Sequence, residues 1–226
     1  MSKEEENILA NYAEVFNSSK NAFEILTNTE LKFGMIELKN GEKVELTDIN
    51  YTVFMKNEDE DIREKAFNMY REKYKEFCGT IAELYLSKVR ENVITARLRK
   101  YSSALEMAVF YDDSNLKVYN NLVEAVNQNL DANHEFTTLK KKLLKKDKFH
   151  IYDMFLNPFE KEKDNISFDE AKEQVLNALS IMGDEYINKI KFAFDNGWLD
   201  LYPSNNKYNG AYNMRVYGVH PYVLCN

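Results

Sequence analysis

The sequence contains few of the residues that break helices or cross-link chains. Its 226 residues include only 7 glycines, 3 prolines and 2 cysteines. Scarce glycine and proline favour long helices with few tight turns. Two cysteines as far apart as Cys78 and Cys225 do not make a disulfide framework, so we expect a reducing, cytoplasmic location. No apolar run reaches the roughly 18 residues of a membrane helix, and no basic start followed by an apolar stretch indicates a signal peptide.

Acidic residues outnumber basic ones, 37 to 30, and histidine is scarce. A formal net charge of −7 argues against a nucleic-acid partner. The histidines are His134, His150 and His220, whereas a catalytic zinc usually takes three protein ligands held together. His134-Glu135 begins like a zinc-binding helix motif, but Thr138 stands where the second histidine would be. The sequence therefore assigns no metal ligand, and it contains neither a Gly-x-Ser-x-Gly nor a phosphate-loop motif.

Helical patterns dominate what is present. Ser2 to Glu5 and Ser167 to Glu170 each fit a capping box at the start of a helix. An apolar stripe begins near Asp59 and continues to Val93, and Gly79 within it permits a bend. The sequence therefore predicts a mainly helical fold.

The later helices have their own start and stop signals. A shorter helix fits residues 103–110, and Ser114 is predicted to cap a further long pattern. Gly183 is predicted to follow the end of the helix that begins at Ser167, and Asp184 to start the last helix. That last helix is predicted to end at Gly197.

One segment near the start has strand periodicity instead. Ile36, Leu38, Val44 and Leu46 alternate with polar residues around Asn40-Gly41, which predicts a β-hairpin at residues 35–46. A two-residue loop would place the two apolar sets on opposite faces. A three-residue loop at residues 39–41 pairs Ile36 with Val44 and Glu37 with Lys43, and we expect this register because it makes one apolar face.

The last thirty residues form an aromatic, extended segment. They predict one or two strands, and Gly210 would allow another backbone to approach closely. Two interpretations remain open from the residues: an ordinary buried strand and turn, or an exposed edge that binds a peptide by adding it as a strand. The candidate substrate-binding residues in this segment are Gly210, Ala211, Tyr212, His220 and Tyr222.

Ordered local motifs along the chain resemble the oligoendopeptidase F family of thimet-oligopeptidase-like metallopeptidases. They include Arg63-Glu-Lys-Ala-Phe67, Arg99-Lys-Tyr-Ser-Ser-Ala-Leu-Glu106, Val118-Tyr-Asn-Asn-Leu122, His150-Ile-Tyr-Asp153, Trp198-Leu-Asp-Leu-Tyr202, Gly210-Ala-Tyr212 and Pro221-Tyr-Val-Leu224. The resemblance implies that residues 1–50 end an N-terminal lobe. It implies that residues 51–226 begin a catalytic domain and stop before the zinc-binding helix.

The resemblance also implies a chemistry. The complete enzyme would be a zinc-dependent endopeptidase that cleaves short unstructured peptides, with metal-activated water and a glutamate base. The His-Glu-x-x-His motif is absent from these 226 residues, so we expect no zinc on this chain and no activity from it alone. Its expected partners are short peptides and the missing C-terminal part of the catalytic domain.

Two departures from the family pattern and one alternative remain. The family often has a basic residue just before Gly-Ala-Tyr, where this chain has Tyr208-Asn209, with Lys207 one position earlier. The chain also begins where the family is already within its N-terminal lobe. The alternative function is a non-catalytic helical interaction module, or one half of a complementing pair, because apolar faces of the tail and long helices would lack cover.

Overall fold

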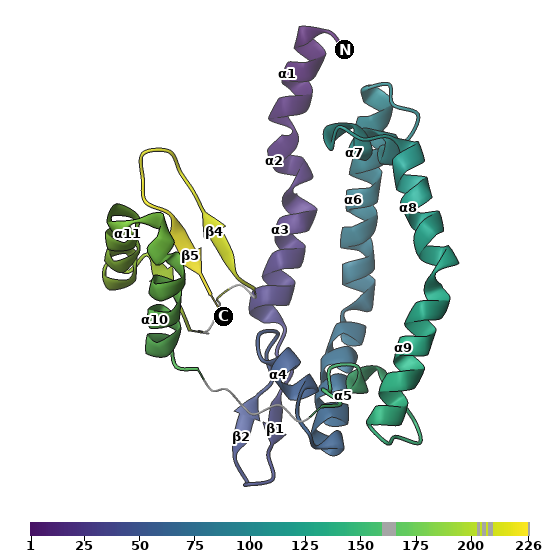
Figure 1. Cartoon of the computed structure of the whole chain (residues 1–226). Helices are drawn as coiled ribbons and strands as arrows, with labels where there is room; N and C mark the ends of the chain where they lie inside the picture. The colour runs from purple at the N-terminus through teal and green to yellow at the C-terminus, as the bar shows by residue number, and fades with distance from the viewer. Residues whose placement is uncertain (160–165, 203, 205–206, 208–209, 226) are drawn as a thin grey trace. The chain divides into compact units, whose positions relative to one another are not determined.

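The structure is a computed structural model that describes residues 1–159, 166–202, 204, 207 and 210–225 (Figure 1). It divides into two compact units. The helical unit comprises Met1–Leu46 and Val53–Pro158, and the sheet unit comprises Thr47–Thr52 and Phe159–Asn226. The predicted boundary between residues 50 and 51 concerns the complete family fold, and it stays a prediction.

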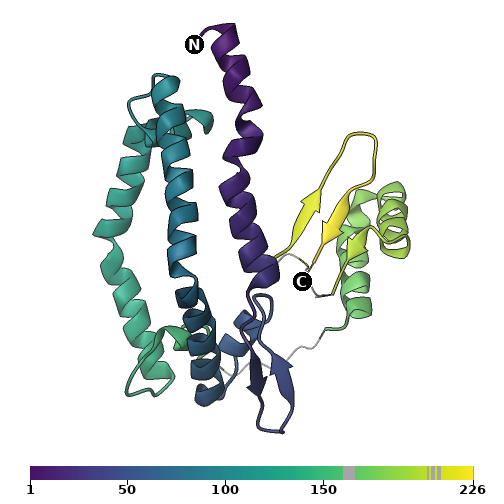
Figure 2. The ribbon, with the colours of Figure 1, turned by 180° about the vertical axis from the view of Figure 1, so that it is seen from behind.

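The helical unit opens with a nearly continuous column of short helices. The elements are α1 (Lys3–Asn11), α2 (Ala13–Phe16), α3 (Ser18–Ile25) and the π-helix η1 (Leu26–Glu30). The first capping box is confirmed, because the Glu5 N–H donates to Ser2 Oγ at 3.2 Å and the Ser2 N–H donates to Glu5 Oε2 at 2.6 Å. Figures 1 and 2 show α3 alongside α6, with which it packs.

The β-hairpin has the predicted register. Strands β1 (Met35–Glu37) and β2 (Lys43–Glu45) pair antiparallel, with Ile36 opposite Val44 and Glu37 opposite Lys43. Ile36 is fully buried, and Gly41 takes the positive φ of 84° that the three-residue loop requires. One apolar face and one charged pair therefore fixed the register, as expected.

The predicted long helix is two helices in sequence. After α4 (Tyr51–Met55), α5 (Glu60–Glu76) ends at Phe77 and α6 (Cys78–Leu98) continues. Asp59 caps α5 by accepting a hydrogen bond from the Asp61 N–H. The helical path breaks at Phe77, which has φ −102° and ψ 10°, two residues before the glycine at which the sequence permitted a bend.

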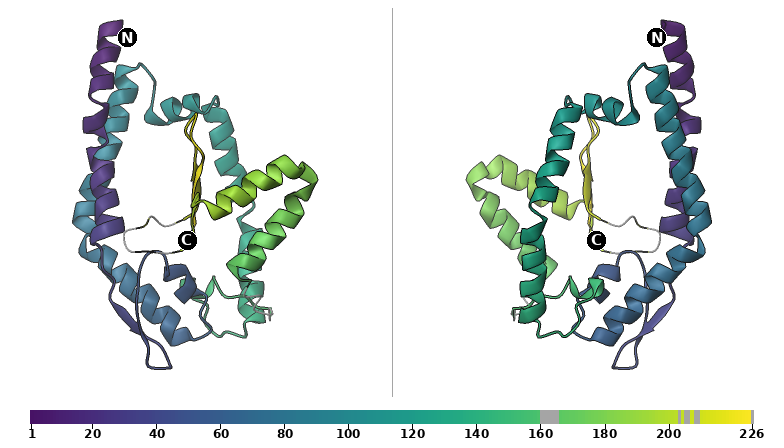
Figure 3. Two further views of the ribbon diagram at one scale, coloured as in Figure 1. Left: turned by 90° about the vertical axis from the view of Figure 1, so that its left-hand side faces the viewer. Right: turned by 90° about the vertical axis from the view of Figure 1, so that its right-hand side faces the viewer.

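The remaining helices of this unit are α7 (Ala104–Tyr111), α8 (Leu116–Gln128), α9 (Leu130–Leu143) and the 3₁₀ turn η2 (Ile151–Asp153). The prediction that Ser114 caps α8 is wrong by one residue. Asn115 has the extended cap conformation, and its side chain accepts from the N–H groups of Lys117 and Val118. No residue of α8 or α9 is buried, and Figure 3 shows both helices standing apart from α6.

The core of the helical unit lies where α5, the hairpin and η2 meet. Ile36, Leu46, Met55 and Ala66 are each at most 1% exposed. Contacts of α5 with β1 and with η2 bring these elements together. The apolar face of the hairpin therefore packs on α5, as its alternating pattern requires.

The sheet unit combines helices with a small mixed sheet. Its elements are α10 (Phe168–Ala178), the 3₁₀ turn η3 (Leu179–Met182), α11 (Asp184–Asp195), β3 (Leu199–Asp200), β4 (Tyr212–Met214) and β5 (Tyr222–Leu224). Ser167 and Glu170 form the second predicted capping box. Gly183 follows η3 with φ 90°, and α11 starts at Asp184 as predicted.

The strand order in the sheet is β3-β5-β4, with β3 parallel and β4 antiparallel to β5. The sequence predicted one or two strands here; β4 and β5 fill that place, and the two-residue β3 is additional. Figure 3 shows this sheet edge-on, with α11 against one of its faces. Among the described helices, none is both long enough and apolar enough to cross a lipid bilayer.

Candidate functional site

The candidate site is built on β4, one of the two outer strands of the three-stranded sheet. The N–H of Val223 donates to Trp198 O at 2.8 Å, so the backbone of Val223 points toward β3. Because backbone direction alternates along a strand, Tyr222 and Leu224 point their N–H and C=O groups toward β4. They lie opposite Met214 and Tyr212.

That register leaves the backbone of Asn213 directed away from the sheet. Tyr212 and Met214 use their backbone groups toward β5, and the residue between them faces the other way. β4 has no further strand beside it among the described residues. A free strand edge with an outward N–H and C=O can pair with another extended chain.

Side chains divide between the two faces of the sheet. Asn213, Val223 and Leu199 share the face toward α10 and α11, where they line a cavity. Tyr212, Met214 and Tyr222 share the opposite face, at 46%, 55% and 51% exposure. The predicted candidates Tyr212 and Tyr222 therefore lie together on a face that the sheet unit leaves open.

His220 lines the cavity and also contacts Tyr222, so it lies at the border between the cavity and the open face of the sheet. Its ring stacks on Trp198 with centroids 4.5 Å apart and planes 9° apart, and it also meets the Tyr222 ring at 4.4 Å. Its Nδ1 lies 2.9 Å from the backbone oxygen of Pro221, the distance of a hydrogen bond in the tautomer that carries a proton on Nδ1. These contacts orient the imidazole as one wall of the cavity.

The predicted glycine and small residue stand just before β4. Gly210 has φ 107°, which favours glycine, and a Cβ at this position would meet no atom within 4 Å. Ala211 is exposed. Tyr208 and Asn209, which precede this motif, lie outside the described residues. Among the described residues, the Cβ side of Gly210 is therefore open.

Lys207, the basic residue preceding this segment, is already paired. Its Nζ lies 3.0 Å from Asp200 Oδ1, and it donates to the backbone oxygens of Asp200 and Tyr202. Its side chain is 4% exposed. Lys207 thus holds the segment that follows β3 in place.

The cavity of the sheet unit has a volume of about 720 Å³. Its lining comes from α10, α11 and all three strands, and it includes Val175, Tyr186, Trp198 and His220. Most of these side chains are apolar or aromatic, which is typical of sites that take small apolar groups.

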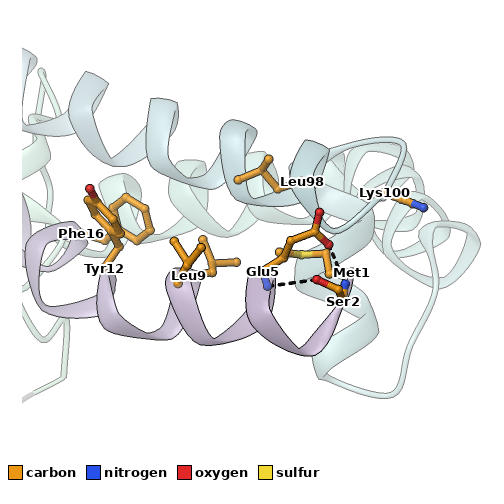
Figure 4. A pocket seen from close by; sticks show the side chains of 9 residues that line it. Met1, Ser2, Glu5, Leu9, Tyr12, Phe16, Leu98 and Lys100 are labelled. Carbon is orange, nitrogen blue, oxygen red and sulfur yellow. Dashed lines mark hydrogen bonds between the residues drawn. The ribbon is translucent and has the colours of Figure 1, made fainter.

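A second cavity, of about 740 Å³, lies in the helical unit between α1, α2 and the end of α6 (Figure 4). Leu9, Phe16 and Leu98 contribute apolar walls. Its polar groups Ser2 and Glu5 bond to each other in the capping box (Figure 4). The capping box thus uses the side chains of Ser2 and Glu5 to hold the start of α1. None of the candidate residues predicted from the sequence lines this cavity.

Sequence reasoning missed a buried ionic cluster in the helical unit. Arg63 Nη2 donates to Asp153 Oδ1 at 2.6 Å, with both side chains at most 1% exposed. Lys146 Nζ lies 3.1 Å from the same oxygen and 2.7 Å from Glu60 Oε2. Arg63 also donates to the backbone oxygens of residues 57 and 58.

This cluster changes the acidity of its carboxylate. Burial by itself raises the pKa of Asp153, but the N–H of His150, with Arg63 and Lys146, outweighs it and lowers the pKa below its ordinary value. Arg63 and Asp153 each belong to a motif that the sequence analysis names, but the two residues are 90 positions apart in the chain. No local pattern connects them, and only the fold shows that they are partners. Their complete burial indicates a structural role.

The described residues do not fit a zinc site. No three or more His, Cys, Asp or Glu side chains among them are placed to hold a metal ion. His134 and His150 take no part in the candidate site, and the His150 ring stacks on Tyr152 at 4.9 Å.

Asn213 was not named among the residues of the candidate site in the sequence analysis. The sequence places Asn213 within a predicted strand. The direction of its backbone N–H and C=O, away from β5, follows only from the strand order and register of the sheet.

Comparison with known proteins identifies the family. Residues 53–226 match Peptidase family M3. Oligopeptidase PepF of Bacillus subtilis (strain 168) is 34% identical over 226 residues, covering 100% of this chain and 34% of the relative. An oligoendopeptidase F homologue of Borreliella burgdorferi is 34% identical over 227 residues, covering 100% of this chain and 38% of the relative. The chain thus spans about a third of the length of these relatives.

Solved structures agree. The crystal structure of oligoendopeptidase-F from Enterococcus faecium matches with a TM-score of 0.68 and 32% identity, over 88% of this chain and 38% of that one. A structure of PZ peptidase A with an inhibitor matches in fold, with a TM-score of 0.76 at 16% identity, over 94% of this chain and 38% of that one. The predicted resemblance to oligoendopeptidase F is confirmed, and the chain belongs to peptidase family M3.

Proposed function

We propose that this chain is part of a zinc-dependent oligoendopeptidase, in which β4 forms one edge of the peptide-binding site. The complete enzyme would hydrolyse internal bonds of short unstructured peptides. The family supports the class of reaction. The outward backbone of Asn213 on the outer strand is the observation that supports the location.

A peptide would bind by pairing with this edge. Its backbone would exchange hydrogen bonds with the N–H and C=O of Asn213, which gives affinity with little dependence on sequence. Gly210 and Ala211 directly precede this edge, and a Cβ at Gly210 would meet no described atom within 4 Å. Tyr212 and Tyr222 would border the peptide on the open face of the sheet, and His220 would lie between Tyr222 and the cavity.

Zinc and the catalytic base would come from sequence beyond these 226 residues. The described residues do not fit a metal site, and no residue of this chain receives a catalytic role. In the complete enzyme zinc would supply an activated water. The chain's own contribution would be to bind and orient the substrate backbone.

A proline substitution tests the edge. Asn213→Pro removes the outward N–H but keeps the ladder to β5, because proline is tolerated where a strand's N–H faces solvent. We expect it to weaken the binding of fluorescently labelled extended peptides, measured by anisotropy. Asn213→Ala is the matched control, since it keeps the N–H. Equal affinity for all three proteins would show that peptides do not use this edge.

The isolated chain tests whether it binds substrate without carrying the zinc and the catalytic base. We expect elemental analysis to find no stoichiometric zinc, and quenched fluorescent peptides to remain uncleaved. Chelator-sensitive cleavage together with bound zinc would contradict the proposal that the metal site lies elsewhere.

An uncovered helix face favours a second candidate, in which the chain is an interaction module or half of a complementing pair. On α8, Val118, Leu122 and Val126 recur at helical spacing and are 56%, 63% and 55% exposed. Apolar side chains so arranged usually pack against another surface. Light scattering of the purified chain would show a dimer or larger species under this candidate, and a stable monomer would count against it.

A further inference from the structure

The cavity of the sheet unit reaches the strand edge at one residue. The side chain of Asn213 lines the cavity beside Val223 and Leu199. The backbone of the same residue faces outward along the free edge of β4. Asn213 therefore belongs to both the cavity wall and the peptide-binding edge.

Strand geometry connects the two. In a paired strand, the residue opposite Asn213 lies about 5.5 Å away and points its side chain to the same face as the Asn213 side chain. For a peptide added to β4, that face is the one toward α10 and α11. One peptide side chain would thus stand at the cavity.

The chemistry of the cavity favours an apolar, aromatic group. Trp198 and His220 form a stacked pair on one wall, and Tyr186 and Val175 come from the covering helices. Aromatic rings gain from offset or edge-to-face contacts with other rings. A volume of about 720 Å³ exceeds what one side chain needs.

The sheet unit does not fill this space itself. Ala193 is the only apolar residue of its described part that is buried, at 8% exposure. Val175 at the cavity remains 41% exposed. A bound side chain would therefore cover apolar surface that is now in contact with water.

We propose that this cavity is a specificity pocket for one aromatic or large apolar side chain of a peptide paired with β4. The proposal rests on the function proposed for that edge. The pocket would add a preference for one kind of peptide side chain to binding that otherwise depends on backbone hydrogen bonds.

The single tryptophan of the chain makes a direct test possible. Trp198 is the only tryptophan among the 226 residues, and it lines the cavity. The probes are two blocked pentapeptides of alanine, one with a central phenylalanine and one with a central serine. We expect the phenylalanine peptide alone to change the emission of Trp198. We also expect it to bind roughly tenfold to a hundredfold more tightly, the range for removing one large apolar side chain from water.

Two substitutions separate this pocket from the edge. Val175→Phe narrows the cavity and should reduce the preference for phenylalanine over serine without abolishing binding of the serine peptide. Ile181→Phe is the matched control, because Ile181 is 90% exposed and lies outside the cavity lining. Circular dichroism of both variants checks that they fold.

The outcomes distinguish the two proposals. If neither peptide binds, or if Asn213→Pro leaves both affinities unchanged, the edge itself is wrong. If both peptides bind equally and Trp198 emission does not respond, the edge stands and the pocket is overturned. A phenylalanine preference that Val175→Phe removes and Ile181→Phe retains supports the pocket.

Discussion

The helical unit and the sheet unit bury their apolar side chains to very different extents. In the helical unit, α5, the hairpin and η2 enclose Ile36, Leu46 and Met55 almost completely. In the described part of the sheet unit, Ala193 alone among apolar residues is buried. The sheet unit instead has a cavity where a core would be, and one open apolar face of its sheet.

This difference indicates which region is rigid and which is available for binding. A closed core resists local opening, whereas elements with few buried contacts open at lower free energy. The proposed peptide edge and pocket both belong to the less buried unit. The helical unit, by contrast, is stabilised by a core that includes an ion pair.

Breaking the ion pair between Arg63 and Asp153 should cause the largest loss of stability among these changes. Asp153→Asn would leave Arg63 buried without a charged partner, which is expected to destabilise the helical unit by about 3–5 kcal/mol. Urea unfolding followed by circular dichroism measures the loss. Glu37→Gln is the control, because its pair with Lys43 is exposed and worth about 0–1 kcal/mol. Similar losses in the two variants would contradict the importance of the buried pair.

Acid should weaken the same cluster by a smaller amount. The pKa of Asp153 is lowered in the folded protein, so its contribution is complete above the unfolded pKa of about 3.9. It is lost as the pH falls through the lower, folded pKa, because the unfolded chain then binds the proton more readily.

Unfolding free energies of the wild-type chain and of Asp153→Asn, measured from about pH 5 downward, check this. We expect the difference between them to shrink as the pH falls. A difference that stayed constant would show that Asp153 does not titrate between the two states.

Loss of a helix cap should affect more residues in the sheet unit than in the helical unit. Ser167→Ala removes the oxygen that accepts from the Glu170 N–H and should cost about 1 kcal/mol. Because α10 packs on α11 with little core, we expect faster amide hydrogen exchange throughout both helices. The matched change Ser2→Ala should affect only the first turns of α1, and equally local effects in both would contradict the contrast between the units.

The smallest effect is expected on the uncovered face of α8. Leu122 is 63% exposed, so Leu122→Ala should change the stability of the isolated chain by less than about 0.5 kcal/mol. Asn121→Ala on the same helix is the comparison. A clearly larger loss for Leu122→Ala, dependent on protein concentration, would show that α8 packs against a second copy.

Local patterns predicted local structure well. The hairpin register followed from the alternation of Ile36 and Val44 with charged residues, and both capping boxes followed from a serine with a glutamate three residues on. The helix break came at Phe77 instead of Gly79, because a glycine permits a bend without fixing its place.

Features that join distant segments could not be predicted in this way. The Arg63–Asp153 pair spans 90 residues. The outward backbone of Asn213 depends on β5 lying between β3 and β4, an order that no periodicity encodes. The family resemblance pointed to residues 210–222 for the proposed peptide edge, and this stays a prediction. The choice of Asn213 within that segment required the strand pairing.

The central place of β5 has a consequence for synthesis on the ribosome. β5 is the last of the three strands in the chain, yet it is the strand with which both β3 and β4 pair. During translation β3 and β4 are synthesised before β5, so their edges stay unpaired and exposed until β5 follows. The sheet therefore closes only after residue 224 has left the exit tunnel, while the hairpin of β1 and β2 can pair from the start. A translational pause before that point would prolong the interval in which the nascent chain is open to aggregation.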